Sequence, residues 1–243
     1  MTPDEMLGRL LYRDGLMLVI DKPAGLSVHR GPKGGDSLED YFDVLRFGLP
    51  RMPALAHRLD KDTSGCLVLG RHRKALALLG KLFKNGNIGK IYWAVVEGGP
   101  EADEGRIDIP LAKLDENRGW WMKPDPDGKP SSTLWKVMGR GDGKTWLALE
   151  PLTGRTHQLR VHCAEMGFPI LGDAIYGSAP RAGGPPLHLH AREVVVPISK
   201  NKPPVVTTAP APAHMHEMLK ACGWTGEPQA EPVVMAEANT TSP

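Results

Sequence analysis

The stretch His57-Arg58-Leu59-Asp60-Lys61-Asp62-Thr63-Ser64-Gly65 mixes reactive polar side chains with an apolar one, and a second stretch, Gly154-Arg155-Thr156-His157-Gln158-Leu159-Arg160-Val161-His162, does the same. The embedded apolar residues indicate that the charged groups are half-buried. Carboxylates and guanidinium groups in such places need partners. We therefore expect an Asp from the first stretch to pair with an Arg from the second, and together the two stretches point to an enzyme.

The composition sets outer limits on the kind of protein this is. With 41% hydrophobic and 24% charged residues among 243, the chain resembles a soluble globular protein. No apolar run approaches the roughly 20 residues of a membrane span, and the acidic Met1–Glu5 segment does not resemble a secretory signal. We expect a cytoplasmic monomer without membrane contact.

Cysteine usage and charge distribution narrow the class further. Cys66, Cys163 and Cys222 are odd in number, far apart and outside any C-x-x-C pattern, so we expect no disulfide framework and no zinc ribbon. The formal net charge is only +2, but residues 51–90 hold nine Lys or Arg against two acids, a local charge of +7. Such a window is either a solvated helix face or a footprint for phosphates. Its position beside the first reactive stretch favours phosphates.

Hydrophobic patterning predicts an α+β fold with a mixed, largely antiparallel central sheet flanked by helices. Strands are expected at 16–20, 66–69, 91–96 and 188–197, and helices at about 36–46, 74–83, 156–167 and 214–222. Aromatic and aliphatic runs at 120–122, 133–137 and 146–149 suit an antiparallel meander. We expect one catalytic domain over residues 1–224 and a disordered acidic tail over residues 225–243.

Several familiar sites fit these residues poorly. Asp60-x-Asp62-x-Ser64-Gly65 resembles half of a calcium loop, but the twelfth position, which needs a carboxylate, is Arg71. The histidines at 157, 162, 188 and 190 lack the spacing of a zinc helix, so we expect no metal. Ser64 is outside a nucleophile-elbow context. A hydrolase using Asp60 and Asp62 as paired acids remains a weak alternative.

Four motifs in a fixed order make the interpretation specific. They are residues 57–65, Lys90-x-Tyr92, residues 154–162 and Gly172-Asp173-x-x-Tyr176-Gly177. Together they resemble the RluA-type family of RNA pseudouridine synthases over roughly residues 10 to 215. Asp21-Lys22-Pro23-Ala24-Gly25 resembles the family's opening loop, and Leu189-His190-Ala191 its late strand. The chain resembles a short form, without the small N-terminal RNA-binding domain of many relatives.

The resemblance implies a role for each matching residue. Asp60 would be the essential catalytic aspartate, Arg160 its salt-bridge partner, Tyr92 the aromatic that stacks on uracil, and Arg58 the side chain that fills the gap left by a flipped base. Tyr92 could also serve as general base for the proton that leaves C5. Further RNA contacts would come from His57, Thr63, Arg155, His157 and Leu159.

The implied reaction detaches uracil from ribose at N1, rotates it and rejoins it at C5, with no metal, nucleotide or redox cofactor. Its partner would be transfer RNA or ribosomal RNA. A uracil within folded RNA must leave the stack to react, and a planar guanidinium can replace the lost stacking. The competing class is a non-catalytic RNA-binding protein with the same fold.

Overall fold

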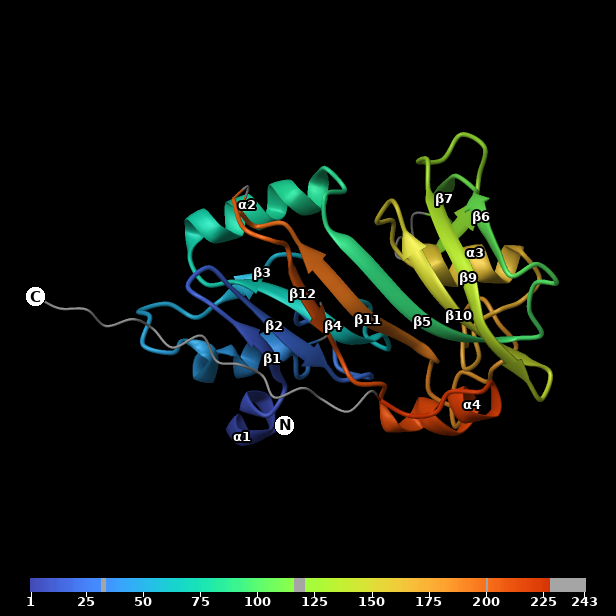
Figure 1. Cartoon of the computed structure of the whole chain (residues 1–243), viewed down its shortest axis with the longest axis horizontal. Coiled ribbons are helices and arrows are strands. Elements are labelled where there is room, and N and C mark those ends of the chain that lie inside the picture. Colours follow the sequence, from blue (N-terminus) through green and yellow to red (C-terminus); the bar gives the residue numbers. More distant parts are fainter. Residues whose placement is uncertain (32–33, 116–120, 200, 228–243) are drawn as a thin grey trace, which may run out of the picture.

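A ten-stranded sheet organises the part of the chain that the computed structural model describes, which is all of it except residues 32–33, 116–120, 200 and 228–243. Neighbouring strands in the sheet run in the order β1 (Leu10–Arg13), β2 (Met17–Lys22), β4 (Ser64–Gly70), β11 (Leu189–Val196), β5 (Gly89–Glu97), β10 (Lys144–Pro151), β9 (Ser132–Gly141) and β6 (Glu104–Asp108). β3 (Ala54–Leu55) pairs with β4, and β12 (Val205–Thr208) pairs with β11. Figure 1 shows β11 and β5 crossing between the two halves of the molecule.

The parallel pairing of β4 with β11 joins the two halves of an otherwise antiparallel sheet. Here Gly65 lies opposite Ala191 with φ +102°, and a Cβ at position 65 would come within 2.3 Å of the Ala191 carbonyl oxygen. Only glycine fits so close an approach of two backbones. The fold confirms the predicted mixed, largely antiparallel α+β architecture and explains why a glycine follows Thr63 and Ser64.

Helices cover both faces of the central strands, and successive side chains of each strand point to opposite faces. On one face, Leu18 of β2 and Leu67 of β4 pack with the 3₁₀-helix η1 (Leu38–Leu45). On the other face, Val19 and Val68 pack with α2 (Arg73–Lys84). On the other half, α3 (Gln158–Glu165) and α4 (His216–Ala221) pack with β5 and β10. The N-terminal α1 (Pro3–Leu7) and the 3₁₀-turn η2 (Ala213–Met215) are the remaining helical elements among the described residues.

Two predicted elements differ in the structure. The helix expected at 36–46 is a 3₁₀-helix over Leu38–Leu45, because apolar residues three to four apart do not distinguish i→i+3 from i→i+4 bonding. β9 and β10 form the expected hairpin, but the first run of the meander does not join them. Met122–Pro124 is β8, which pairs with β7 (Leu111–Lys113) in a separate two-stranded sheet, and Trp120 lies outside the described residues. Pro124 lacks an N–H, which keeps this strand short.

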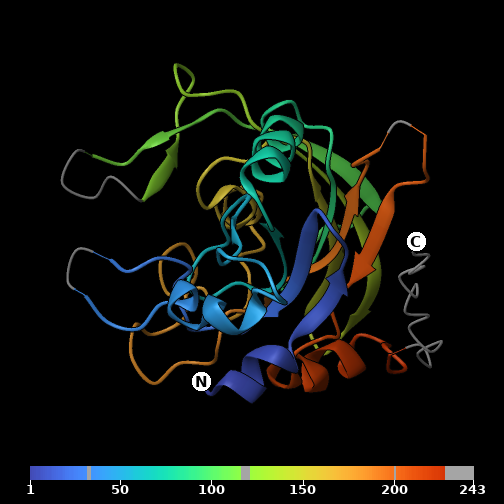
Figure 2. The same cartoon turned by 90° about the vertical axis from the view of Figure 1, so that its left-hand side faces the viewer.

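The β7–β8 hairpin projects from the body. Figure 2 shows it extending on the same side as the loop that follows β2. Among the described residues, no helix combines the length and apolarity that crossing a bilayer would require.

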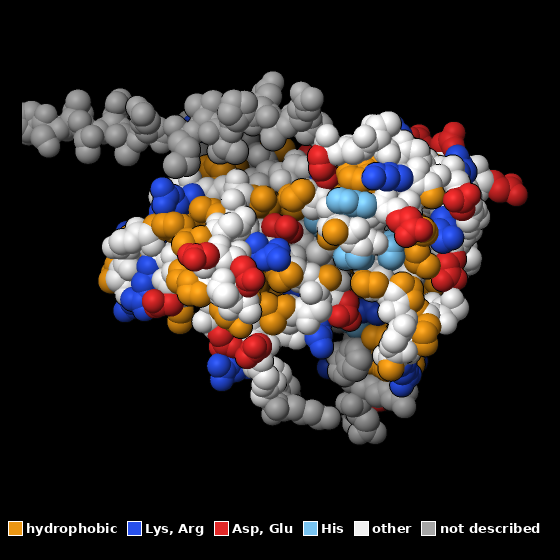
Figure 3. Space-filling model, turned by 90° about the horizontal axis from the view of Figure 1, so that it is seen from below, with side chains coloured by type: hydrophobic (Ala, Val, Ile, Leu, Met, Phe, Trp, Pro, Cys, Tyr) orange, Lys and Arg blue, Asp and Glu red, His pale blue; other side chains and the backbone are white. Residues whose placement is uncertain are grey.

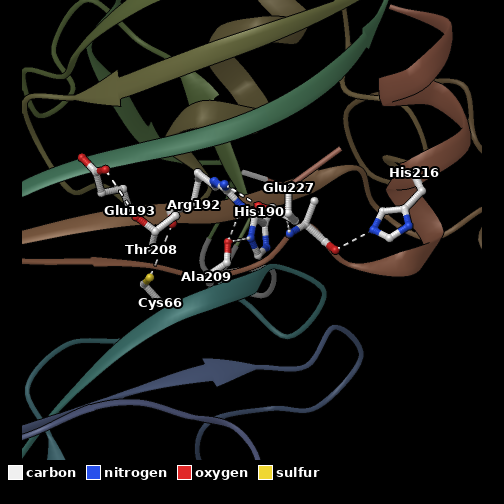
Figure 4. A network of polar contacts seen from close by, with 9 residues as sticks. Cys66, His190, Arg192, Glu193, Thr208, Ala209, His216 and Glu227 are labelled. Carbon is white, nitrogen blue, oxygen red and sulfur yellow. Dashed lines mark hydrogen bonds and ion pairs between the residues drawn. The ribbon is translucent and has the colours of Figure 1, made fainter. Parts of the chain in front are cut away.

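Glu227, expected within the tail, is instead held by the folded domain (Figure 4). Its carboxylate accepts from both terminal nitrogens of Arg192 at 2.8 and 2.6 Å and from the Ala211 N–H at 2.6 Å. The Arg192 guanidinium also lies 4.1 Å from the Trp93 ring centroid and donates to the Ala209 carbonyl. The domain therefore extends at least to Glu227. The predicted disorder of residues 228–243 falls outside the described residues.

We expect Glu227→Gln to lower the free energy of unfolding by about 1–2 kcal/mol at neutral pH, because Arg192 loses its charged partner. Burial alone would raise the pKa of Glu227, but the hydrogen bonds from Arg192 and Ala211 lower it below 4.5. The stabilisation is thus present above that value and is lost as the pH falls through the folded pKa. Denaturant titrations at neutral and acidic pH should show the wild type and the variant converging in acid. The exposed Glu101→Gln serves as control, and an equal effect of both variants would contradict a stabilising role of the Glu227–Arg192 pair.

Candidate active site

The first reactive stretch forms a loop between β3 and β4, and a buried lysine holds this loop in place. Lys22, at the end of β2, is fully buried and donates to the carbonyls of Pro23, Lys61 and Thr63, each at 2.8 Å. The Gly25 N–H also donates to Lys61 O, at 3.0 Å. Burial lowers the pKa of Lys22 to about 8, while the nearby Asp62 and Asp60 carboxylates oppose that shift. One cation therefore satisfies three loop carbonyls and fixes the backbone around Asp60.

Asp60 lies in a pocket of about 160 Å³ where the two reactive stretches meet β5. Eight of the nine expected site residues line it: Arg58, Asp60, Thr63, Tyr92, Arg155, His157, Leu159 and Arg160. Among the described residues that line the pocket, Asp60 is the only carboxylate, and it shares the pocket with the cations Arg58, Lys90, Arg155 and Arg160. The pocket thus presents a single anion surrounded by cations.

Tyr92 forms the β5 side of the pocket and packs against two hydrophobic clusters, one from each half of the molecule. Burial raises the pKa of its phenol, and the negative charge of Asp60 adds to the effect. The neutral phenol therefore persists at physiological pH, which favours stacking over proton abstraction by a phenolate.

His57 is the expected site residue that the structure does not bring to the pocket. Its Nε2 accepts from the Val68 N–H at 3.0 Å, and its ring stacks on Phe83 of α2 with centroids 4.3 Å apart. Burial, together with the charge of Lys90, lowers the pKa of His57 to about 3. A neutral imidazole that accepts a strand N–H links the first reactive stretch to β4, and the expected RNA contact of this residue stays a prediction.

The expected salt bridge between Arg160 and Asp60 does not form in the structure, where Arg160 pairs with Asp173. Arg160 Nε and NH2 donate to the two carboxylate oxygens of Asp173, each at 2.7 Å, and both side chains are buried. Asp173 Oδ1 accepts in addition from the N–H groups of Ile175 and Tyr176. The buried acid of the Gly172-Asp173 motif therefore occupies the Nε–NH2 edge of the guanidinium, the edge that here makes two parallel hydrogen bonds with a carboxylate.

His157 is the residue whose side chain faces Asp60 at ion-pair range. Its Nε2 lies 3.7 Å from Asp60 Oδ2, and its Nδ1 lies 2.8 Å from the Tyr176 hydroxyl. His157 begins α3 with φ +52°, a left-handed conformation that costs energy for a residue with a Cβ. Burial lowers the pKa of His157, although the Asp60 charge opposes this.

Three residues that shape the site were absent from the predicted set. Lys22 and Asp173 both lie in recognisable sequence motifs. The motifs do not show which carbonyls Lys22 binds, or which arginine pairs with Asp173. Gln158 is the third: its Oε1 accepts from Thr153 and from the Arg155 N–H, and its Nε2 donates to the Ser132 carbonyl. Its role could have been predicted because the Gln158 side-chain amide lies in the buried first turn of α3, where a polar group without hydrogen-bond partners is costly.

The paired-carboxylate alternative loses its geometric basis. Asp60 lines the pocket, whereas Asp62 is exposed and does not line it. The two acids do not face a common site.

The comparisons with known proteins agree with this geometry. Residues 16–165 match the family described as RNA pseudouridylate synthase. The chain is 43% identical over 206 residues to an uncharacterised RNA pseudouridine synthase of Zymomonas mobilis, covering 84% of this chain and 94% of that one. It is 35% identical over 221 residues to a ribosomal large subunit pseudouridine synthase C of Vibrio cholerae, covering 86% of this chain and 68% of that one.

A solved structure shows the same fold. The structure titled human RNA pseudouridylate synthase domain containing 4 superposes with a TM-score of 0.74 at 26% identity, covering 89% of this chain and 95% of that one.

Fold and pocket together define an RNA-modifying isomerase. The chain belongs to the RNA pseudouridine synthase family, and within that family to the RluA type.

We expect Arg160→Lys to lower the free energy of unfolding by about 1–3 kcal/mol and to reduce turnover strongly, because an ammonium cannot make both contacts with the buried Asp173. Thermal denaturation and a turnover assay would measure the two effects.

Arg106→Lys is the matched control, since the Arg106–Asp108 pair is more than half exposed on both sides. If the two arginine variants lose equal stability, the Arg160–Asp173 pair does not anchor the site.

Proposed function

We propose that this protein isomerises uridine to pseudouridine in structured RNA, with Asp60 as the catalytic carboxylate. The observation that carries the proposal is the single carboxylate in a pocket lined by Arg58, Lys90, Arg155 and Arg160. Such a lining attracts a phosphate-linked nucleotide and leaves one anion to act on it. Covalent or general-base catalysis by a carboxylate is compatible with this arrangement.

Base flipping is part of the proposal, and the position of Asp60 within the pocket supports it. Asp60 and Tyr92 lie in a recess that a stacked, paired uracil cannot enter, so the nucleotide has to leave the helix. Arg58 is exposed at the pocket, where its planar guanidinium is free to occupy the vacated stack. Tyr92 is then the stacking surface for the extruded uracil.

Large-subunit ribosomal RNA is the substrate we favour over transfer RNA. The support is the printed name of the relatives from Vibrio cholerae and Haemophilus ducreyi, both ribosomal large subunit pseudouridine synthase C. Mapping pseudouridines in total RNA from a deletion strain tests this choice. Loss of sites in transfer RNA with ribosomal sites intact would reverse it.

The exposed face of α2 is the proposed track for the RNA backbone. Arg73, Lys74, Lys81 and Lys84 are all exposed, and none forms an ion pair within the described residues. The helix ends beside the pocket: Phe83 stacks on His57, next to Arg58, and Gly86 approaches the Leu152 carbonyl beside the pocket residues Pro151 and Thr153. The underside of the molecule, away from α2, intersperses acids with cations instead (Figure 3).

We expect Asp60→Asn to fold and bind RNA but to form no detectable pseudouridine, because none of the other described residues that line the pocket carries a carboxylate. Asp62→Asn should retain most activity. Chemical derivatisation of the mass-silent isomer, followed by mass spectrometry, measures both. Comparable product from Asp60→Asn would rule out Asp60 as the catalytic residue.

We expect the double variant Lys81→Gln/Lys84→Gln to weaken RNA binding. The slope of log K against log salt concentration should become shallower by about 1–2, because fewer phosphate contacts release fewer counterions on binding. Lys136→Gln/Lys220→Gln removes equal charge from exposed positions elsewhere and is the control. Equal slopes for the two double variants, measured by binding titrations over a salt series, would exclude α2 as the track.

A further inference from the structure

A chain of polar contacts connects the projecting β7–β8 hairpin to Asp60. The Met122 N–H, at the start of β8, donates to the Tyr176 hydroxyl at 2.8 Å. That hydroxyl lies 2.8 Å from His157 Nδ1, and His157 Nε2 lies 3.7 Å from Asp60 Oδ2. Three side chains from separate segments thus lead from a peripheral hairpin to the pocket.

The positions of the protons on Tyr176 and His157 follow from which groups donate hydrogen bonds to them. A phenol has one proton, and Tyr176 uses its oxygen to accept from Met122, so its own proton is available for His157 Nδ1. When Nδ1 accepts, a neutral imidazole carries its proton on Nε2. The Nε2–H then faces Asp60.

The two ends of this series of polar contacts are held with different firmness. Asp173 Oδ1 accepts the Tyr176 N–H at 3.0 Å, and the Arg160 guanidinium lies 5.3 Å from the Tyr176 ring centroid. His157 has a left-handed backbone, and its ring nitrogens lie between the Tyr176 hydroxyl and Asp60 Oδ2. The hairpin end is different, because β7 and β8 form their own sheet outside the main one. Movement of the hairpin would therefore alter the Met122–Tyr176 contact first.

We propose that Tyr176 and His157 are positioning residues that orient the Asp60 carboxylate and make its orientation depend on docking of the β7–β8 hairpin. The 3.7 Å separation between His157 and Asp60 exceeds a hydrogen bond. Under the proposal this contact tightens when substrate fills the pocket, as catalytic hydrogen bonds commonly do. Strained backbone at this point is the kind of feature that functional positioning retains. The proposal rests on the proposed function, in which Asp60 performs the chemistry.

Tyr176→Phe tests the proposal by removing one oxygen and leaving the ring beside Arg160 in place. The variant should slow single-turnover pseudouridine formation between about tenfold and 100-fold, with RNA affinity within about twofold of wild type. Tyr12→Phe is the control, because its hydroxyl also contacts a side chain, Asp14 at 3.0 Å, on a strand outside the pocket. An unchanged rate in Tyr176→Phe, or parallel losses of rate and affinity, would overturn the proposal.

A spectroscopic measurement tests the same chain without reference to activity. Long-range ¹⁵N–¹H correlation spectra of the wild type, assigned by comparison with His157→Asn, should show His157 as the Nε2–H tautomer with Nδ1 accepting, and Tyr176→Phe should lose that Nδ1 signature. An Nδ1–H tautomer in the wild type would overturn the proposal. If the wild type forms no pseudouridine in any RNA, the proposed function fails, while the tautomer still decides whether Tyr176 and His157 are linked as described.

Discussion

The buried ion pair between Arg160 and Asp173 is the interaction on which the geometry of the site depends. Asp173 is fully buried, and its pKa is kept low because hydrogen bonds from Arg160 and the Ile175 and Tyr176 N–H groups outweigh the effect of burial. The pair binds the first turn of α3 to the segment after it. It thereby sets Tyr176 against His157, and His157 against Asp60. Breaking a pair buried this deeply leaves an uncompensated charge, which costs several kcal/mol.

A second constraint holds the first reactive stretch, residues 57–65, from the opposite side of the pocket. Lys22 gathers three loop carbonyls, and the contact of Gly65 with Ala191 brings β4 against β11. Ser64 adds a buried hydrogen bond to His190 Nδ1 at 2.8 Å. Asp60 is thus fixed by its backbone from one half of the sheet and approached by side chains from the other. If Asp60 performs the chemistry, as proposed, its place between two rigid halves means that it needs little reorganisation during the reaction.

Much of this arrangement could be predicted from the sequence, and its failures have physical causes. Runs of apolar residues identify β2, β4, β5 and β11 in the sequence, because a strand that is buried on both faces consists of consecutive hydrophobic residues. The partner of Arg160 could not be predicted, since every acid near the site is an equally good partner until the direction of α3 is known. Lys22 looks like a surface residue in sequence, because its burial depends on carbonyls supplied 39 and 41 residues later. Glu227 was assigned to the tail because a single glutamate in a polar segment does not show in sequence that it pairs with a distant arginine.

The most direct test of this account is the single-turnover release of tritium from RNA labelled at uridine C5, measured for Asp173→Asn beside the wild type. Rejoining the ring at C5 displaces that hydrogen, so tritium release reports the isomerisation itself. If the Arg160–Asp173 pair positions Asp60 through Tyr176 and His157, the folded variant should bind RNA normally and release tritium at least about tenfold more slowly. A folded Asp173→Asn protein that releases tritium at the wild-type rate would contradict the account.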